Sequence, residues 1–267
     1  MRTGRFDVLS AFVIGFALLV ASSQAQFADD GGDNVSAYSV GSNGALTPIA
    51  GSPFPAGSKP DSVAVDPKAR FAYVANGGGN NISAYRIAPN GALMPIPGSP
   101  FAAGNLPSSV AADPKGRFVY VVNESGCNIS AYTLGSDGAL TPIPGSPFAG
   151  GSAPSAVTVH PRARFAYVVN EGGNNVSAYR LAPNGALTPV PGSPFVAGTD
   201  PHKAYATAKF VYVANEVSNN ISAYRIGSNG ALTPIPGSPF AGGIGPHAVA
   251  VDPTGKFVYV TNKGLPH

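Results

Sequence analysis

Short apolar runs separated by turn residues recur along this chain at a nearly constant spacing. One unit shows the pattern, with apolar runs at residues 63–65, 71–76, 82–87 and 93–96. Runs of this length that are rich in β-branched and aromatic residues, and bounded by Gly, Pro, Asn and Asp, indicate β-strands. We therefore expect four short strands in each unit.

The unit is repeated along almost the whole chain. The tripeptide Ser-Ala-Tyr occurs five times, and its occurrences begin 47, 47, 47 and 45 residues apart, at Ser36, Ser83, Ser130, Ser177 and Ser222. A period near 47 residues with four strands per unit is typical of a β-propeller, in which each unit folds as one blade. We therefore expect an all-β propeller of about five four-stranded blades.

Residue types within a unit predict the order of its strands from axis to rim. The run at 63–65 is short and built of small residues, as expected where strands crowd a central axis. Pro95 in the run at 93–96, and Pro97 directly after it, cannot donate ladder hydrogen bonds, so this strand should form the outer edge. Asn90-Gly91 predicts a hairpin turn, and the Asp-Pro-Lys-Gly sequence at 113–116 predicts a tight turn.

The two ends of the chain predict how the ring closes. The first recognisable strand, at 35–40, has the sequence of a third strand, whereas the last, at 257–261, has that of a second strand. We expect the two end pairs to complete one composite blade, which removes exposed sheet edges. The alternative is a fragment of a larger ring that closes by pairing with another chain. The propeller domain then spans 34–262, between a flexible segment at 26–33 and a tail at 263–267.

The N-terminus predicts export. Two arginines precede an apolar run from about residue 8 to residue 20, and Ser-Gln-Ala at 23–25 places small residues where a signal peptidase cuts. We expect a signal peptide over residues 1–25, cleavage after Ala25 and a secreted or periplasmic protein. The apolar run is short for a membrane span, so the membrane is expected as a partner only if the signal stays uncleaved.

Composition excludes several classes of function. Charged residues make up 11% of the chain, and a net charge of +3 is too weak and dispersed for nucleic-acid binding. The single cysteine, Cys127, excludes an internal disulfide framework. A nucleophile elbow, a phosphate loop and a dinucleotide fingerprint are all missing from the sequence. We expect a monomer without a cofactor.

Antiparallel strand direction sorts the loops onto two faces. The top face carries the loops before each first strand and between each second and third strand, and the bottom face carries the other turns. Candidates for proton-transfer chemistry gather on the top face: Glu124, Glu171, Glu216, His202 and His247. Cations gather on the bottom face, where they could bind an anionic cell-surface polymer: Lys68, Arg70, Lys115, Arg117, Arg162, Arg164 and Lys256. The alternative for both sets is ordinary solvated loop residues.

No metal site is expected from the spacing of candidate ligands. The four histidines are scattered without the spacing of a zinc motif. Asp66, Asp113 and Asp252 occupy equivalent turns, where a carboxylate that caps the next amides explains them without a metal.

One tetrapeptide points to a known family. Tyr-Val-Thr-Asn at 259–262 matches the signature of the YVTN-repeat propellers, and the surrounding residues 255–260 resemble the lactonase-like propellers. That family includes proteins similar to 6-phosphogluconolactonase and to fungal cycloisomerases. The resemblance covers residues 34–262, although family members usually have seven blades and this chain supplies five.

The resemblance also bears on individual residues. Glu124, Glu171 and Glu216 each follow an asparagine, as in the Val-Asn-Glu stretch of the family. The Gly-Pro-His sequence that ends at His247 is similar to the family's Gly-Pro-Arg-His segment without its arginine. The resemblance implies a lactone hydrolase in which a carboxylate or imidazole activates water.

Two functions stay open at this point. One is a non-catalytic binding or surface scaffold with an unidentified ligand, and the other is a 6-phosphogluconolactonase-type hydrolase with its site on the top face. The five units are nearly copies, whereas catalysis needs one differentiated pocket, so the sequence favours the scaffold. The unit that contains residues 204–208 lacks two residues and the Asp-Pro turn, which we interpret as a damaged inner strand.

Overall fold

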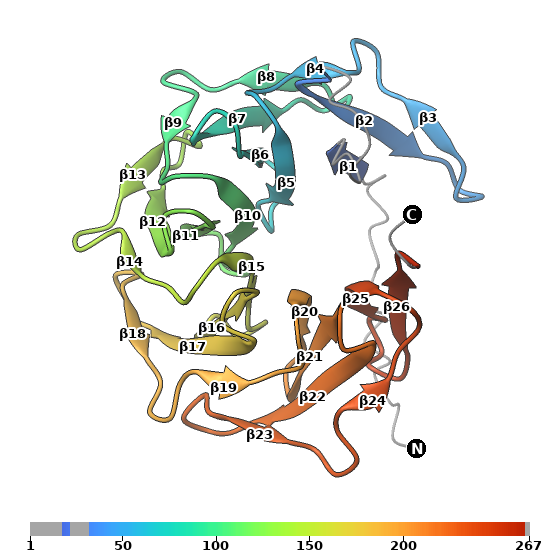
Figure 1. The fold of residues 1–267 in the computed structure, drawn as a ribbon. Helices are drawn as coiled ribbons and strands as arrows, with labels where there is room; N and C mark the ends of the chain where they lie inside the picture. Colours follow the sequence, from blue (N-terminus) through green and yellow to red (C-terminus); the bar gives the residue numbers. More distant parts are fainter. Residues whose placement is uncertain (1–17, 22–31, 265–267) are drawn as a thin grey trace, which may run out of the picture.

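The chain folds as a β-propeller, as predicted. The computed structural model describes residues 18–21 and 32–264, and these form six antiparallel sheets arranged around a central axis (Figure 1). No helix among the described residues is long and apolar enough to cross a membrane.

The first complete blade in the chain shows the plan of the other complete blades. Its strands run from axis to rim in the order β5 (Pro60–Val65), β6 (Phe71–Asn76), β7 (Asn81–Ile87) and β8 (Leu93–Pro95). The short strand β9 (Phe101–Ala102) extends the same outer edge by pairing with the other half of β7. The proline-containing strand β8 therefore lies on the rim, as the missing amide hydrogens require.

Three further complete blades repeat this plan. Their strands are β10 (Pro107–Ala112), β11 (Phe118–Asn123), β12 (Asn128–Leu134), β13 (Leu140–Pro142) and β14 (Phe148–Ala149); β15 (Pro154–Val159), β16 (Phe165–Asn170), β17 (Asn175–Leu181), β18 (Leu187–Pro189) and β19 (Phe195–Val196); and β20 (Pro201–Ala206), β21 (Phe210–Asn215), β22 (Asn220–Ile226), β23 (Leu232–Pro234) and β24 (Phe240–Ala241). Each inner strand contacts the inner strand of the next blade, so the axis is lined by one strand per blade.

The two ends of the ring differ from the prediction. Strands β25 (Pro246–Val251) and β26 (Val258–Asn262) form a separate two-stranded sheet, and the predicted composite blade is not formed. The N-terminal sheet contains β2 (Asn34–Val40), β3 (Leu46–Pro48) and β4 (Phe54–Pro55), and its β2 pairs with β1 (Leu18–Ala21). The apolar segment β1 takes the second-strand place on β2, so the edge of β2 is occupied and unavailable to β26.

Among the described strands, only β25 pairs with β26, so its other edge has no strand partner there. Tyr259 is 63% exposed, whereas the equivalent Tyr73 of a complete blade is fully buried. Figure 1 shows an opening between β26 and the sheet of β2. Apart from β1, the predicted signal peptide and the predicted flexible segment up to residue 31 lie outside the described residues.

Tyrosine hydroxyls join neighbouring blades. In the middle of the second strand of three blades, a buried tyrosine donates a hydrogen bond to the turn of the next blade: Tyr73 to the carbonyl of Gly138 over 2.8 Å, Tyr120 to that of Gly185 over 2.9 Å, and Tyr167 to that of Gly230 over 3.3 Å. A buried hydroxyl needs such a partner, because an unsatisfied polar group in the interior is costly. These bonds therefore fix the position of one blade against the next.

The repeated Ser-Ala-Tyr tripeptide has a role for each residue. Ser83 Oγ accepts a hydrogen bond from Asn76 Nδ2 over 2.9 Å, and the amide of Ala84 donates to Ser99 Oγ over 2.9 Å. The hydroxyl of Tyr85 donates to the carbonyl of Pro55 in the preceding sheet over 2.5 Å. The repeat is thus retained because each residue makes a bond that a blade needs.

Candidate functional site

Two positions of the repeat meet at the top face of the ring. We call the residue that follows each second-strand asparagine the exit position, and the residue after the proline that begins each inner strand the entry position. The exit positions hold Gly77, Glu124, Glu171, Glu216 and Lys263, and the entry positions hold Asp61, Ser108, Ser155, His202 and His247. An inner strand begins at the end of the sheet where its second strand finishes, so both sets lie on one face.

These positions show that the blades are not chemical copies. The blade of β20–β24 carries Asp200, His202, Lys203 and Glu216 around its upper end. The blade of β10–β14 has uncharged residues at three of the same places, namely Leu106, Ser108 and Ser109. The blade of β20–β24 therefore carries more ionisable groups at its upper end than the blade of β10–β14 does.

His202 lies between two glutamates from different blades. Its Nε2 atom is 3.4 Å from Glu216 Oε2 and 3.8 Å from Glu171 Oε2. His247, from the next inner strand, places Nδ1 3.0 Å from the same Glu216 oxygen. Four of the five candidates predicted on the top face are thus brought into one cluster, which we call the top-face cluster: Glu171, His202, Glu216 and His247.

The cluster is held by backbone hydrogen bonds at strand ends. The amide of Glu216 donates to the carbonyl of Asp200 over 2.8 Å, and the hydroxyl of Ser155 donates to the carbonyl of His202 over 3.0 Å. Lys263 is held by a 2.8 Å bond from its amide to the carbonyl of Gly245, and its Nζ lies 3.1 Å from Glu216 Oε2. Side chains on such ends are positioned by the sheet rather than by mobile loops.

Burial and crowded charge shift the protonation of the cluster. Burial, followed by the charge of neighbouring Asp200, raises the pKa of Glu171 to about 7. Burial, followed by the charge of His247, lowers the pKa of His202 to about 4, so its imidazole is neutral at pH 7. Burial also acts to raise the pKa of Glu216, but hydrogen bonds from His247 and Lys263 outweigh it and the net shift is downward.

Lys203 is a functional candidate that the sequence analysis missed. It belongs to the inner strand β20, and burial lowers the pKa of its ammonium group, although the charges of Asp61, Glu124 and Glu171 act in the opposite direction. Its Nζ donates to the carbonyl of Ser155 over 3.4 Å. Glu124, the fifth predicted candidate, acts on the cluster through its charge.

A comparison of equivalent positions would have found these residues. Asp61, Lys203 and Lys263 each stand where other units have serine, alanine or glutamate. Asp200 likewise occupies a place that holds Leu106 and Ala153 in other units. These residues are recognisable because they differ from the residues at equivalent positions of the repeat, and not because they form a sequence motif.

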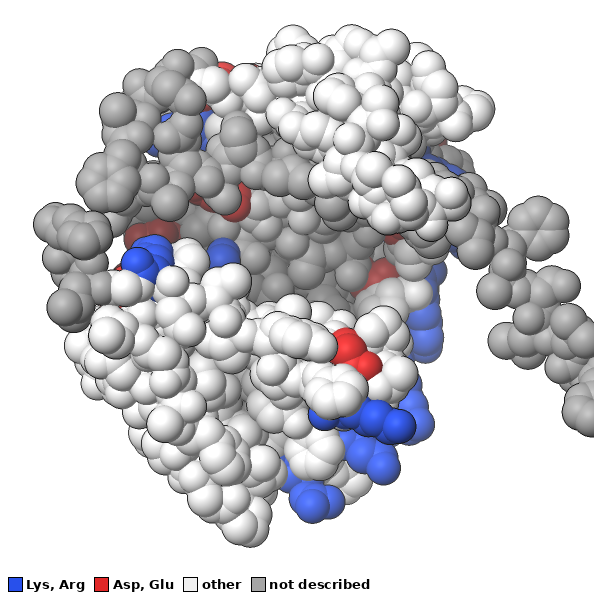
Figure 2. All heavy atoms as spheres, turned by 90° about the vertical axis from the view of Figure 1, so that its right-hand side faces the viewer, with Lys and Arg blue, Asp and Glu red and all other residues white. Residues whose placement is uncertain are grey.

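The bottom face carries the predicted cations, but two of them are paired. Arg117 lies 2.9 Å from the carboxylate of Asp113, and Arg70 lies 3.1 Å from that of Asp66. Both carboxylates also accept amide hydrogen bonds in their turns, as the capping interpretation predicted. In the view of Figure 2, Lys and Arg lie mainly along one edge of the molecule, with a smaller group on the opposite side. The rim is therefore less free to bind an anion than the number of its cations suggests.

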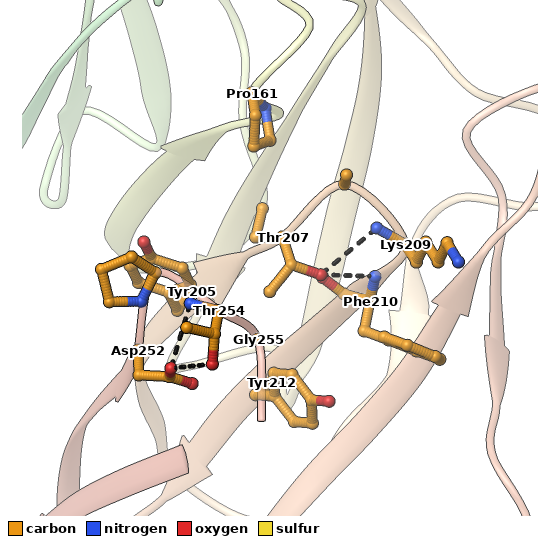
Figure 3. Close-up of a pocket in the computed structure, with 12 residues that line it drawn as sticks. Pro161, Tyr205, Thr207, Lys209, Phe210, Tyr212, Asp252, Thr254 and Gly255 are labelled. Atoms are coloured by element: carbon orange, nitrogen blue, oxygen red, sulfur yellow. Dashed lines mark hydrogen bonds between the residues drawn. The ribbon is translucent and has the colours of Figure 1, made fainter. Parts of the chain in front are cut away.

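A separate hollow of about 520 Å³ lies on the bottom face (Figure 3). It lies beside the turn after β20, which is two residues shorter than in other units, and there Thr207 Oγ1 accepts hydrogen bonds from the amides of Lys209 and Phe210. The missing residues belong to this turn, since β20 is as long as the other inner strands. The inner strand is thus intact, which corrects the interpretation that it was damaged. No residue of the top-face cluster lines this hollow.

The fold is that of a β-propeller, and a cluster of ionisable residues lies at one end of its ring. The chain belongs to the seven-bladed β-propeller lactonase family, because the family profile "Lactonase, 7-bladed beta-propeller" matches residues 19–264. The described residues supply four complete blades and two partial sheets of such a ring. No curated protein matches the chain.

Several solved structures share the fold of this chain. A periplasmic gluconolactonase from Pseudomonas aeruginosa has a TM-score of 0.71 and 20% identity, over 93% of this chain and 76% of that chain. A functionally unknown protein from Desulfotomaculum acetoxidans has a TM-score of 0.68 and 18% identity, over 86% and 73%. A candidate 6-phosphogluconolactonase from Bacteroides uniformis has a TM-score of 0.65 and 15% identity, over 94% and 90%. At these identities, the likeness concerns the fold.

Proposed function

We propose that this protein hydrolyses a lactone that carries no phosphate group, at the top-face cluster. The observation that carries the proposal is the position of His202 between Glu171 and Glu216. An imidazole and a carboxylate in contact can accept a proton from water and return it to a leaving group. Membership of the lactonase family supports the same reaction class.

The argument that favoured a non-catalytic scaffold no longer holds. It rested on near-identical repeat units, but the entry and exit positions differ in charge from blade to blade. The differences gather where the side chains of Glu171, His202, Glu216 and His247 meet, which provides the differentiated group of side chains that catalysis needs. The hydrolase therefore accounts for more of the structure than the scaffold does.

The arrangement assigns different roles to the two glutamates. Glu216 Oε2 faces His202, His247 and Lys263, and Oε1 lies 3.4 Å from Lys263 Nζ, so this carboxylate is already engaged. Glu171 has no lysine within salt-bridge distance among the described residues. Glu171 is therefore the better general base, and Glu216 orients the histidines.

The proposed reaction is balanced by these groups alone. The oxygen of a water molecule bonds to the lactone carbonyl carbon while Glu171 takes a proton from that water. The ring carbon–oxygen ester bond then breaks, and the released alkoxide takes a proton, which His202 is placed to relay from Glu171. The product is the open-chain hydroxy acid. A positioned base of this kind contributes about 10² to 10⁴ in rate.

The local charge favours a neutral substrate. Five carboxylates lie in or near the site, against three lysines: Asp61, Glu124, Glu171, Asp200 and Glu216 against Lys59, Lys203 and Lys263. A phosphate would meet an excess of like charge, which opposes its binding. Of the two activities that the names of the structural neighbours describe, gluconolactone hydrolysis fits this charge better than hydrolysis of a phosphorylated lactone.

The test is a hydrolysis assay with glucono-1,5-lactone and with its 6-phosphate. We expect a higher kcat/KM for the neutral lactone, and a loss of about 10² or more in kcat for Glu171→Gln. Glu124→Gln is the matched control, since it makes the same change at the same repeat position one blade away, and it should keep most of the activity. Equal activity of Glu171→Gln and wild type, with the fold intact, contradicts the proposal.

Export stays a separate proposal. Cleavage after Ala25 would remove β1 and free the edge of β2 that it covers. N-terminal sequencing of protein recovered from outside the cytoplasm should begin near Gln26. Recovery of exported protein that retains Met1 would contradict the cleavage.

A further inference from the structure

We propose that His202, His247 and Glu216 bind a divalent transition-metal ion of the zinc type. One nitrogen from each imidazole and one oxygen of the carboxylate lie within 4.8 Å of one another. No ligand spacing in the sequence predicts this site, because each ligand comes from a different strand end and the histidines belong to different blades.

The distances between the donor atoms suit such an ion. Metal–ligand bonds of about 2.0–2.1 Å in a tetrahedral site place neighbouring donor atoms about 3.3 Å apart. Glu216 Oε2 lies 3.4 Å from His202 Nε2 and 3.0 Å from His247 Nδ1, so small side-chain movements would complete the geometry. Two imidazoles and one carboxylate form a donor set that zinc enzymes use, with the fourth position open.

The surroundings make the site accessible and attractive to a cation. The side chains of His202 and Glu216 are each 23% exposed, so an ion can enter from solvent. Glu171 and Asp200 form a second group with His202, in which donor atoms also lie within 4.8 Å of one another. These two carboxylates add negative charge beside the proposed ligands and therefore favour a divalent cation.

Lys263 provides a distinctive test of the metal site, because its ammonium group contacts the carboxylate that the metal ion would bind. Its Nζ lies 3.1 Å from Glu216 Oε2, the same oxygen that the metal would bind. Binding of the ion must displace this ammonium group. Removal of the lysine charge should therefore tighten metal binding, whereas removal of any ligand should weaken it.

The experiment is calorimetric titration of chelator-treated, untagged protein with zinc chloride, together with the visible absorption of the cobalt(II) form. We expect one ion per chain and an intense cobalt band typical of low coordination number. His202→Ala, His247→Ala and Glu216→Gln should each weaken binding by about tenfold or more. Lys263→Met should strengthen it, and His160→Gln, on the bottom face, should leave it unchanged.

The outcomes separate this inference from the proposed hydrolase. Zinc titration that shows no binding, or equal binding by wild type and both His→Ala variants of verified fold, overturns the metal site. Weaker binding by Lys263→Met also overturns it. Zinc binding without lactone hydrolysis leaves the site standing and removes the hydrolase, whereas hydrolysis by protein that binds no zinc does the reverse.

Discussion

His202 and His247 occupy the same position in consecutive repeat units, and their ring centroids lie 4.2 Å apart. Each imidazole follows the proline that begins an inner strand, at β20 and at β25. Contact between these inner strands brings the rings together over Glu216. A single histidine at this position would not form a site, but two histidines from neighbouring units do.

Blade packing should make one turn glycine far more sensitive than its equivalent. Gly185 has a φ of +86°, and a Cβ there would lie 2.5 Å from Ile143 Cδ1 and 2.6 Å from Phe118 Cδ1. Gly44 has a φ of +82° at the same repeat position, but a Cβ there would meet nothing within 4 Å. Both Gly→Ala changes incur backbone strain of about 1–2 kcal/mol, and overpacking adds about 1–3 kcal/mol for Gly185→Ala alone.

Chemical denaturation of the two variants measures this difference. The free energy of unfolding should fall more for Gly185→Ala than for Gly44→Ala. Equal losses would mean that the turn of one blade does not pack against its neighbour as the structure shows.

The second-strand asparagine should be important only where a blade is complete. Asn123 is fully buried, and its Nδ2 donates to Asn128 Oδ1 over 2.7 Å and to Ser130 Oγ over 2.9 Å. Asn262 is exposed at the open edge, where its Oδ1 accepts a bond from the amide of Gly243 over 3.2 Å. Asn123→Ala should cost about 1–3 kcal/mol in unfolding free energy, because it leaves buried groups without partners.

Asn262→Ala is the matched control, and it should cost less. Thermal unfolding followed by circular dichroism compares the two variants. If Asn262→Ala were equally destabilising, the edge of β26 would be covered in solution, contrary to the structure.

Alkaline pH should destabilise the propeller through its buried tyrosines. Burial raises the pKa of Tyr73, Tyr120 and Tyr167 well above the ordinary value of 10, and nearby aspartates add to this at the first two. The folded state then holds these protons more tightly than the unfolded state. Their contribution is fully present below pH 10 and is lost as the pH rises from 10 towards the folded pKa values.

The measurement is unfolding free energy between pH 8 and pH 12. Tyr120→Phe removes one of these ionisable groups, together with its hydrogen bond to Gly185, so it should be less stable at pH 8 and lose stability less steeply above pH 10. A steeper alkaline loss in Tyr120→Phe than in wild type would contradict the assignment.

The turn carboxylates should contribute to stability rather than to binding. Asp113 is fully buried and accepts bonds from the amide of Lys115 and from the guanidinium of Arg117. Asp113→Ala removes the partner of a charged group, so we expect a loss of about 1–3 kcal/mol. Asp252→Ala, at the exposed equivalent turn, should cost less in the same denaturation assay. A larger loss for Asp252→Ala would show that the exposed turn, not the buried one, is critical.

The blade plan of this protein can be predicted from its sequence. Strands, tight turns and the proline-bearing rim follow from short-range patterns, such as the Asp-Pro turns and Ser83-Ala84-Tyr85, and a fixed period repeats them. These features depend on residues that are close together in the chain, so they can be predicted from the sequence. The sequence also places Glu171, Glu216, His202 and His247 on one face, because strand direction alternates within each unit.

Which of these residues meet depends on how neighbouring blades pack. Glu216 and His247 lie 31 residues apart in the chain, and their contact depends on the angle between neighbouring blades. The closure of the ring is also a long-range matter, since β1 occupies the second-strand place on β2 although only β26 has the sequence of a second strand. Local patterns show which segments can pair, but the competition between distant segments is settled by packing.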